Sequence, residues 1–121
     1  MISIFIVEDD LSLQTLYEMM INHFGFKVVG KASNGKEAIE KFISFSSKPD
    51  LILMDHRMPV KNGIDTAIEL LNINSDAKIL FASADNSING RALEIGAASF
   101  IKKPFTVVEL LNKIKKVLNL I

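Results

Sequence analysis

The chain has 121 residues, enough for one domain with a single hydrophobic core, so we expect one domain over residues 1–121. Its 14 Lys and Arg residues balance its 14 Asp and Glu residues, which removes any electrostatic argument for a nucleic-acid or anionic-membrane partner. The lack of cysteine excludes disulfides and thiolate metal sites and fits a cytoplasmic location. The first apolar run is too short for a signal peptide, and no run approaches the roughly 18 residues of a membrane helix.

Five strand-like runs alternate with helical patterns along the chain. The predicted strands are residues 2–7, 27–32, 51–54, 78–82 and 99–102. Such alternation predicts βαβ units and therefore a parallel sheet. The run 51–54 is apolar throughout, as is typical of a strand covered on both faces.

The helical patterns carry apolar stripes that we expect to face the sheet. They are Leu13, Leu16, Met20, Ile21 and Phe24 in the first helix, Ala38, Ile39, Phe42 and Ile43 in the second, Ala67, Ile68 and Leu71 in the third, and Val107, Leu110, Leu111, Ile114, Val117, Leu118 and Ile121 in the last. Met19 is expected to fill the core. The segment 86–95 should form a poor helix because it holds two asparagines and a glycine. Thr106 is the expected N-cap of the last helix.

Polar side chains stand at the ends of four predicted strands. Glu8, Asp9 and Asp10 follow the first strand, Asp55 the third, Ser83 the fourth and Lys103 the fifth. The carboxyl ends of parallel strands meet at one edge of the sheet, where ligands bind. Carboxylates, a hydroxyl and a lysine gathered there suit a hard divalent cation beside a nucleophilic aspartate.

Four motifs in register carry a resemblance to a known family. They are Val7-Glu8-Asp9-Asp10, Met54-Asp55-His56-Arg57-Met58-Pro59 with Gly63, Ala82-Ser83-Ala84 and Lys102-Lys103-Pro104-Phe105. In this order and spacing the whole chain resembles the receiver domain of two-component response regulators. The resemblance implies a flavodoxin-like, doubly wound α/β fold with helices on both faces of a five-stranded parallel sheet of order 2-1-3-4-5.

The resemblance also implies roles for the acidic residues. Asp55 would be the phosphoacceptor, attacking a phosphohistidine or a small acyl phosphate. Glu8, Asp9 and Asp55 would hold Mg²⁺, with Mn²⁺ as an alternative, and Arg57 would add its backbone carbonyl. Many relatives have Asp in place of Glu8, so we expect the longer Glu8 to act through a water and Asp9 to bind directly. Asp10 is expected to cap the first helix instead.

The remaining site residues follow the later strands. Ser83 resembles the switch hydroxyl that bonds a phosphoryl oxygen, and Lys103 resembles the lysine that pairs with another. The Lys103–Pro104 bond is expected to be cis, with Lys102 facing solvent. Phe100 matches the aromatic switch position, where many members have Tyr, so ordinary strand packing is an open alternative for it.

Arg57 and Asp85 each lie two residues beyond a site residue, and in the family these positions resemble the ones that tune hydrolysis. An Arg57–Asp85 pair would partly cover the approach of water in line with the phosphorus–aspartate bond. The alternative is that both side chains point to solvent. The two histidines, His23 and His56, are expected to be structural or solvent-facing.

The resemblance implies a signalling module switched by phosphorylation rather than a turnover enzyme. Its partners would be a sensor histidine kinase or a histidine phosphotransfer protein, and an effector bound by the fourth helix, fifth strand and last helix. An intermediate phosphorelay shuttle and a receiver fragment of a longer regulator stay open.

Two rival classes fit less well. A phosphohydrolase of the haloacid-dehalogenase type needs a general acid where this chain has Arg57, and a cap domain for which 121 residues leave no room. A flavodoxin-like carrier of FMN needs a phosphate loop after the first strand, where three consecutive acids, Glu8 to Asp10, would repel a phosphate.

Overall fold

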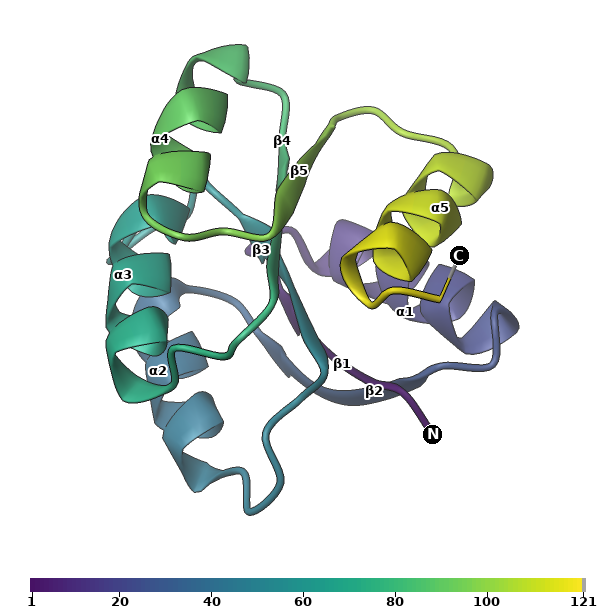
Figure 1. Cartoon of the computed structure of the whole chain (residues 1–121), viewed down its shortest axis with the longest axis horizontal. Coiled ribbons are helices and arrows are strands. Elements are labelled where there is room, and N and C mark those ends of the chain that lie inside the picture. The colour runs from purple at the N-terminus through teal and green to yellow at the C-terminus, as the bar shows by residue number, and fades with distance from the viewer. Residues whose placement is uncertain (121) are drawn as a thin grey trace.

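The computed structural model describes residues 1–120, which fold into a five-stranded sheet flanked by helices (Figure 1). The strands are β1 (Ser3–Val7), β2 (Lys27–Ala32), β3 (Leu51–Asp55), β4 (Ile79–Ser83) and β5 (Ser99–Lys102). The helices are α1 (Leu11–His23), α2 (Gly35–Ser44), α3 (Gly63–Ile73), α4 (Asn89–Glu94) and α5 (Val107–Val117), with a 3₁₀ turn η1 (Asn86–Ile88) before α4. In the part of the chain so described, no helix is both long and apolar enough to cross a membrane.

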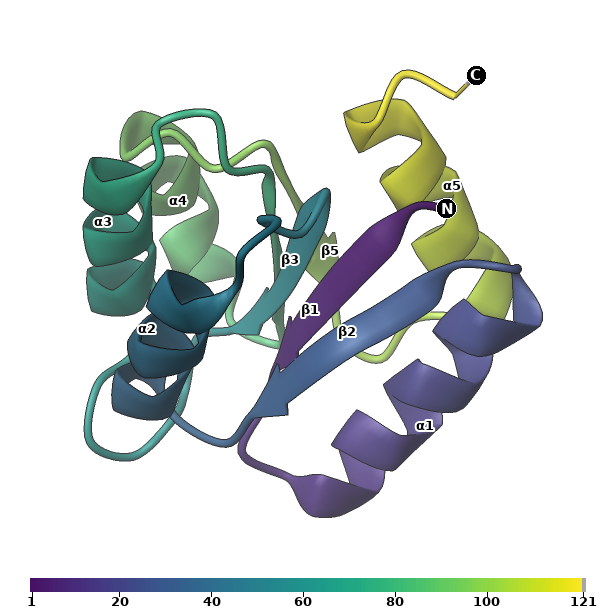
Figure 2. The ribbon, with the colours of Figure 1, turned by 90° about the horizontal axis from the view of Figure 1, so that it is seen from below.

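The sheet has the order β2-β1-β3-β4-β5, and every neighbouring pair of strands is parallel. The doubly wound fold predicted from the sequence is thus confirmed. Figure 2 shows α1 and α5 on one face of the sheet and α2, α3 and α4 on the other. Because β1 lies between β2 and β3, the chain changes direction across the sheet there, which opens a crevice at the carboxyl ends of β1 and β3.

Two hydrophobic clusters form the core, one on each face of the sheet. Phe5 packs with Phe42 and Phe81 under α2, α3 and α4. Ile6, the next residue of β1, packs with Ile21 and the residues beneath α1 and α5. Successive side chains of a strand point to opposite faces, so β1 contributes to both clusters.

The helix stripes predicted from the sequence are partly wrong. The side chains that were expected inside but are more than a third exposed are Leu16 (44%), Met19 (64%), Ile43 (59%) and Val107 (38%). In α1 the buried residues are Gln14, Tyr17 and Ile21, so the inward direction is rotated away from the stripe that apolar residues alone define. In α3 Leu70 is fully buried and was missed, and Ile121 lies outside the described residues.

The two helix N-caps predicted from the sequence, Asp10 and Thr106, are both present. The Asp10 carboxylate accepts hydrogen bonds from the amides of Ser12 and Leu13 at the start of α1. Thr106 and Glu109 form a reciprocal capping box at the start of α5. Segment 86–95 breaks into the turn η1 and the six-residue helix α4, as its poor helix propensity predicts.

Candidate functional site

All of the site residues predicted from the sequence except Phe100 line one cleft of about 550 Å³ at the carboxyl edge of the sheet. Its lining is Glu8, Asp9, Asp10, Leu13, Asp55, Arg57, Ser83, Ala84, Asp85, Asn86 and Lys103. Strand register brings these positions together. Val7 pairs with Met54, so Glu8 and Asp55 follow side by side, and Ser83 pairs with Lys102 directly before Lys103.

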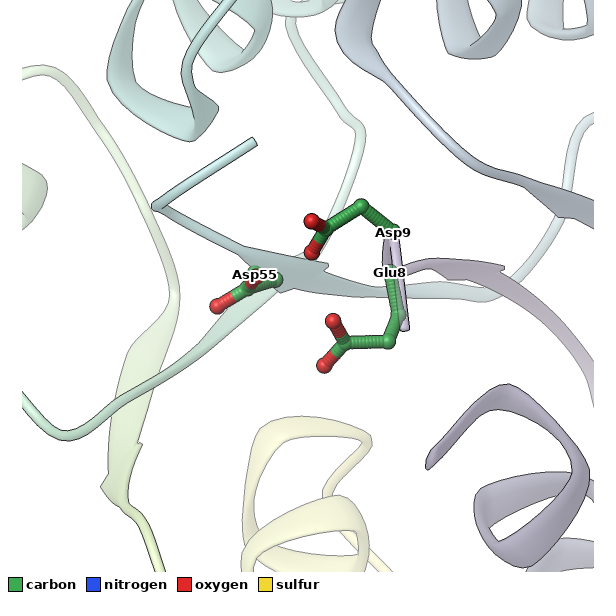
Figure 3. A group of neighbouring side chains, drawn as sticks. All are labelled: Glu8, Asp9 and Asp55. Atoms are coloured by element: carbon green, nitrogen blue, oxygen red, sulfur yellow. The ribbon is translucent and has the colours of Figure 1, made fainter. Parts of the chain in front are cut away.

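Three carboxylates converge at the crevice between β1 and β3 (Figure 3). Glu8 is 2% exposed and Asp55 is 7% exposed, while Asp9 is exposed to solvent. Each offers a carboxylate oxygen, and these oxygens lie within 4.8 Å of one another. A compact set of hard oxygen donors with one solvent-facing member fits Mg²⁺, which favours carboxylates and keeps several of its waters.

Close backbone packing holds Asp55 at the floor of the cleft. The amide of Gly63, at the start of α3, donates to the carbonyl of His56 at 2.8 Å. A Cβ atom at position 63 would lie 2.3 Å from the Asp55 carbonyl oxygen, so only glycine allows this approach. The His56 ring is half-buried and accepts a long hydrogen bond from the amide of Ile64, which agrees with a structural role.

Lys103 is the cation nearest these acids. Its Nζ atom lies 2.7 Å from Glu8 Oε1 and 3.2 Å from Asp55 Oδ1. The Lys103 amide donates to the Ser83 carbonyl at 3.0 Å, which joins the ends of β4 and β5. The Lys103–Pro104 bond is cis and Lys102 is exposed, so both of these predictions are confirmed.

Burial and ion pairing shift the pKa values of the carboxylates in the cleft in opposite directions. Burial raises the pKa of Glu8 to about 7, although the hydrogen bond from Lys103 pulls it down. Burial also raises the pKa of Asp55, and the charge of Lys103 opposes that rise. Desolvation alone would lower the pKa of Lys103, but its bond to Glu8 and the charge of Asp55 outweigh it and raise that pKa. The acids therefore crowd a cleft with one internal counterion, a situation that a bound cation relieves.

A second ion pair lies at the rim of the cleft. Arg57 Nη2 donates to Asp85 Oδ2 at 3.2 Å, with the Arg57 side chain 79% exposed. Asp85 also accepts hydrogen bonds from the amide and hydroxyl of Ser87, which together with Arg57 lower its pKa to about 2. The Ser83 hydroxyl accepts from the Asp85 amide at 3.0 Å. The two side chains thus pair over the loops as expected, while their effect on hydrolysis stays a prediction.

Three further residues are Phe100, which was predicted to be a switch, and Tyr17 and Gln14, which were not predicted. Phe100 is half-buried, with the Lys113 ammonium 5.5 Å from the centre of its ring, and its switch role stays a prediction. Tyr17 was missed; it is 4% exposed and stacks on Phe105 at 5.4 Å beside the cleft. Gln14 was missed as well. Its helical spacing before Ile21, which was predicted to face the core, could have indicated that it is buried.

Comparison with known proteins agrees with this geometry. A family model described as the response regulator receiver domain matches residues 4–115. The chemotaxis protein CheY of Thermotoga maritima is 40% identical over 118 residues, covering 93% of this chain and 97% of that protein. The chemotaxis protein CheY of Bacillus subtilis is 37% identical over 118 residues, covering 96% and 97% of the two chains. The chain belongs to the response regulator receiver domain family.

Solved structures share the fold over almost the whole chain. The response regulator TrrA of Thermotoga maritima, in complex with Mg²⁺ and beryllofluoride, has a TM-score of 0.87 at 30% identity and covers 97% of this chain and 99% of its own. CheY in the CheX–CheY–BeF₃–Mg complex from Borrelia burgdorferi has a TM-score of 0.92 at 24% identity, covering 96% and 88%, which is a likeness of fold. Receiver domains are signalling proteins of two-component systems that bind Mg²⁺ at an acidic site, and the acidic group of this chain matches such a site.

Proposed function

We propose that Asp55 accepts a phosphoryl group from a phosphohistidine, supplied by a sensor histidine kinase or a histidine phosphotransfer protein. The observation that carries the proposal is the placement of Asp55, a nearly buried carboxylate between the acids of β1 and the ammonium of Lys103. The neutral overall charge and cysteine-free composition support a cytoplasmic protein that signals through neither nucleic acid nor membrane.

The transfer forms a bond between an Asp55 oxygen and phosphorus and breaks the bond between phosphorus and the imidazole nitrogen, which keeps the electron pair. Glu8, Asp9, Asp55 and the Arg57 carbonyl would hold Mg²⁺ or Mn²⁺, and the bound cation offsets the charge of the incoming phosphoryl oxygens. The Lys103 ammonium would leave Glu8 for a phosphoryl oxygen, and the Ser83 hydroxyl would bond another.

The proposed protein is a switch that speeds its own phosphorylation and hydrolysis rather than a turnover enzyme. The phosphohydrolase alternative requires a proton donor at the position of Arg57. A guanidinium does not deprotonate at working pH, and this one is engaged with Asp85. That pairing favours acceptance of a phosphoryl group over hydrolytic turnover.

The phosphorylated chain would signal by contact with an effector through the face of α4, β5 and α5. Leu93 of α4 and Val108 of α5 expose apolar side chains, at 51% and 64%. Hydrogen exchange with and without beryllofluoride and Mg²⁺ tests the assignment. We expect changed protection within residues 83–105, and a change confined to another helix would contradict it.

Two pathways remain for this one activity, and each has support. The chemotaxis protein CheY of Thermotoga maritima matches over nearly its full length, which favours a regulator that binds an effector directly. The Arg57–Asp85 pair at the rim favours a long-lived phosphoryl group, which suits an intermediate shuttle in a phosphorelay.

Phosphorylation with a small donor tests the proposal. Phosphoramidate with Mg²⁺ should add the mass of one phosphoryl group to the intact protein, and Asp55→Asn should abolish the gain. Asp50→Asn, at an exposed aspartate remote from the cleft, is the matched control and should label like wild type. Equal labelling of the Asp55→Asn variant would contradict the proposal.

A further inference from the structure

Gln14 is a buried polar side chain in the face of α1 that packs on the sheet, with 6% of its surface exposed. Its amide nitrogen contacts three acceptors: the carbonyl oxygens of Glu8 and Ala32 and, at 3.2 Å, the hydroxyl of Ser33. These acceptors lie at the ends of β1 and β2, where the last bond of the ladder joins the Glu8 amide to the Ala32 carbonyl. Gln14 therefore ties the first helix to the ends of two strands.

The contact with the Glu8 carbonyl has a consequence for the next residue. A peptide unit is planar, so fixing its oxygen also fixes the direction of the amide and Cα of Asp9. Within residues 1–120 the Asp9 carboxylate receives no hydrogen bond and its side chain is exposed. The backbone alone therefore holds Asp9 at the edge of the acidic group.

The other side of this loop is held as well. The Asp10 amide donates to Glu8 Oε2 at 3.2 Å, and the Asp10 carboxylate caps α1. Gln14 reaches the loop from the next turn of the same helix. The three-residue acidic loop is thus held on one side by the helix cap and on the other by Gln14.

We propose that Gln14 is a positioning residue for the cation site: by holding the Glu8 carbonyl it fixes where Asp9 presents its carboxylate, and so sets the affinity for a divalent cation. This inference rests on the proposed function, since it assumes that Asp9 is a metal ligand. Removing a residue that orients a metal ligand typically lowers the metal affinity about 10- to 100-fold. Because Gln14 acts through the backbone, we expect the lower end, about tenfold.

Binding of Mn²⁺, measured through loss of the electron paramagnetic resonance signal of the free ion, tests the inference without any phosphorylation. Gln14→Met keeps the length of the side chain and removes its donors. We expect the Mn²⁺ Kd to rise about tenfold in this variant. Gln14→Asn, which retains the amide on a shorter stem, should bind more weakly than wild type too, and it serves if Gln14→Met does not fold.

The control must separate positioning from loss of stability. Ile21→Val removes one buried methyl group from the same helix at the far end from the loop, so it lowers stability without changing the loop. Its Mn²⁺ Kd should equal that of wild type. A Kd for the Gln14 variants within twofold of wild type, or an equal rise in Ile21→Val, would overturn the inference alone. Failure of wild type itself to bind Mn²⁺ would overturn the proposed function with it.

Discussion

The ammonium of Lys103 lies 2.7 Å from the carboxylate of Glu8, and both side chains are largely buried, at 18% and 3% exposed. This pair links the end of β5 to the end of β1 across the intervening strands β3 and β4. Removing one partner of a buried ion pair leaves an uncompensated charge, which costs about 3–5 kcal/mol. In the metal-free protein, Lys103 therefore stabilises the arrangement of acids on which a cation and a phosphoryl group would depend.

Replacing Lys103 by Met should destabilise the metal-free protein by about 3 kcal/mol, because Glu8 and Asp55 lose their shared counterion. Urea unfolding at neutral pH without metal measures the change. Lys102→Met, at the exposed neighbouring position, should stay within about 0.5 kcal/mol of wild type. Equal stability of the two variants would show that the buried pair contributes nothing.

The metal-free protein should lose stability as pH rises from about 4.5 to about 7. The folded-state pKa of Glu8 is about 7 against its usual 4.5, so between these values the folded state binds more protons than the unfolded state. Stability therefore falls as pH rises through this window, by up to about 3 kcal/mol. Glu8→Gln should flatten most of the slope and leave the part that arises from Asp55. A wild-type slope of opposite sign between these pH values would contradict the account.

Mg²⁺ should raise the melting temperature, because a ligand that binds only the folded state stabilises it by RT ln(1 + [L]/Kd), about 2.7 kcal/mol at a hundredfold excess over Kd. Asp9→Ala should remove most of this gain while changing the metal-free melting temperature little, since Asp9 is exposed. Asp76→Ala, at an exposed aspartate outside the cleft, is the control and should keep the full gain. An unchanged melting temperature of wild type in saturating Mg²⁺ would rule out the site.

The positions of the candidate site residues could be predicted from the sequence because parallel topology determines where strand ends lie. Asp55 and Lys103 are 48 residues apart in the sequence, yet both must lie at one edge of the sheet. The rotation of each helix was harder to predict. Adjacent residues of a helix point in directions about 100° apart. A stripe assigned one position away from the buried face therefore includes Leu16, which is exposed, and leaves out Gln14, which is buried.

Backbone conformation was beyond prediction at one loop near the site. Val60 has a φ of 70°, a left-handed value that a β-branched side chain rarely adopts, and it is 76% exposed. The residue type does not indicate such a conformation here, because left-handed turns are usually occupied by glycine or asparagine and not by valine.

The Arg57–Asp85 pair should lengthen the lifetime of the aspartyl phosphate. The pair lies at the rim of the cleft, where it would partly cover the approach of water in line with the phosphorus–aspartate bond. Arg57→Asn and Asp85→Ala should each speed the decay of the phosphorylated protein several-fold. Because an exposed pair contributes only about 0–1 kcal/mol to stability, the melting temperature should hardly change. Decay rates equal to wild type in both variants would refute this role of the Arg57–Asp85 pair.

The most direct test of the account is chemical mapping of the phosphorylated residue. Borohydride reduces an aspartyl phosphate to homoserine, which marks the modified position permanently for peptide mass spectrometry. After treatment with phosphoramidate and Mg²⁺, we predict homoserine at position 55 and at no other aspartate, including Asp9 and Asp10 in the same cleft. Homoserine at another position, or none in protein that carries the added phosphoryl mass, would contradict the assignment of Asp55 as the phosphoacceptor.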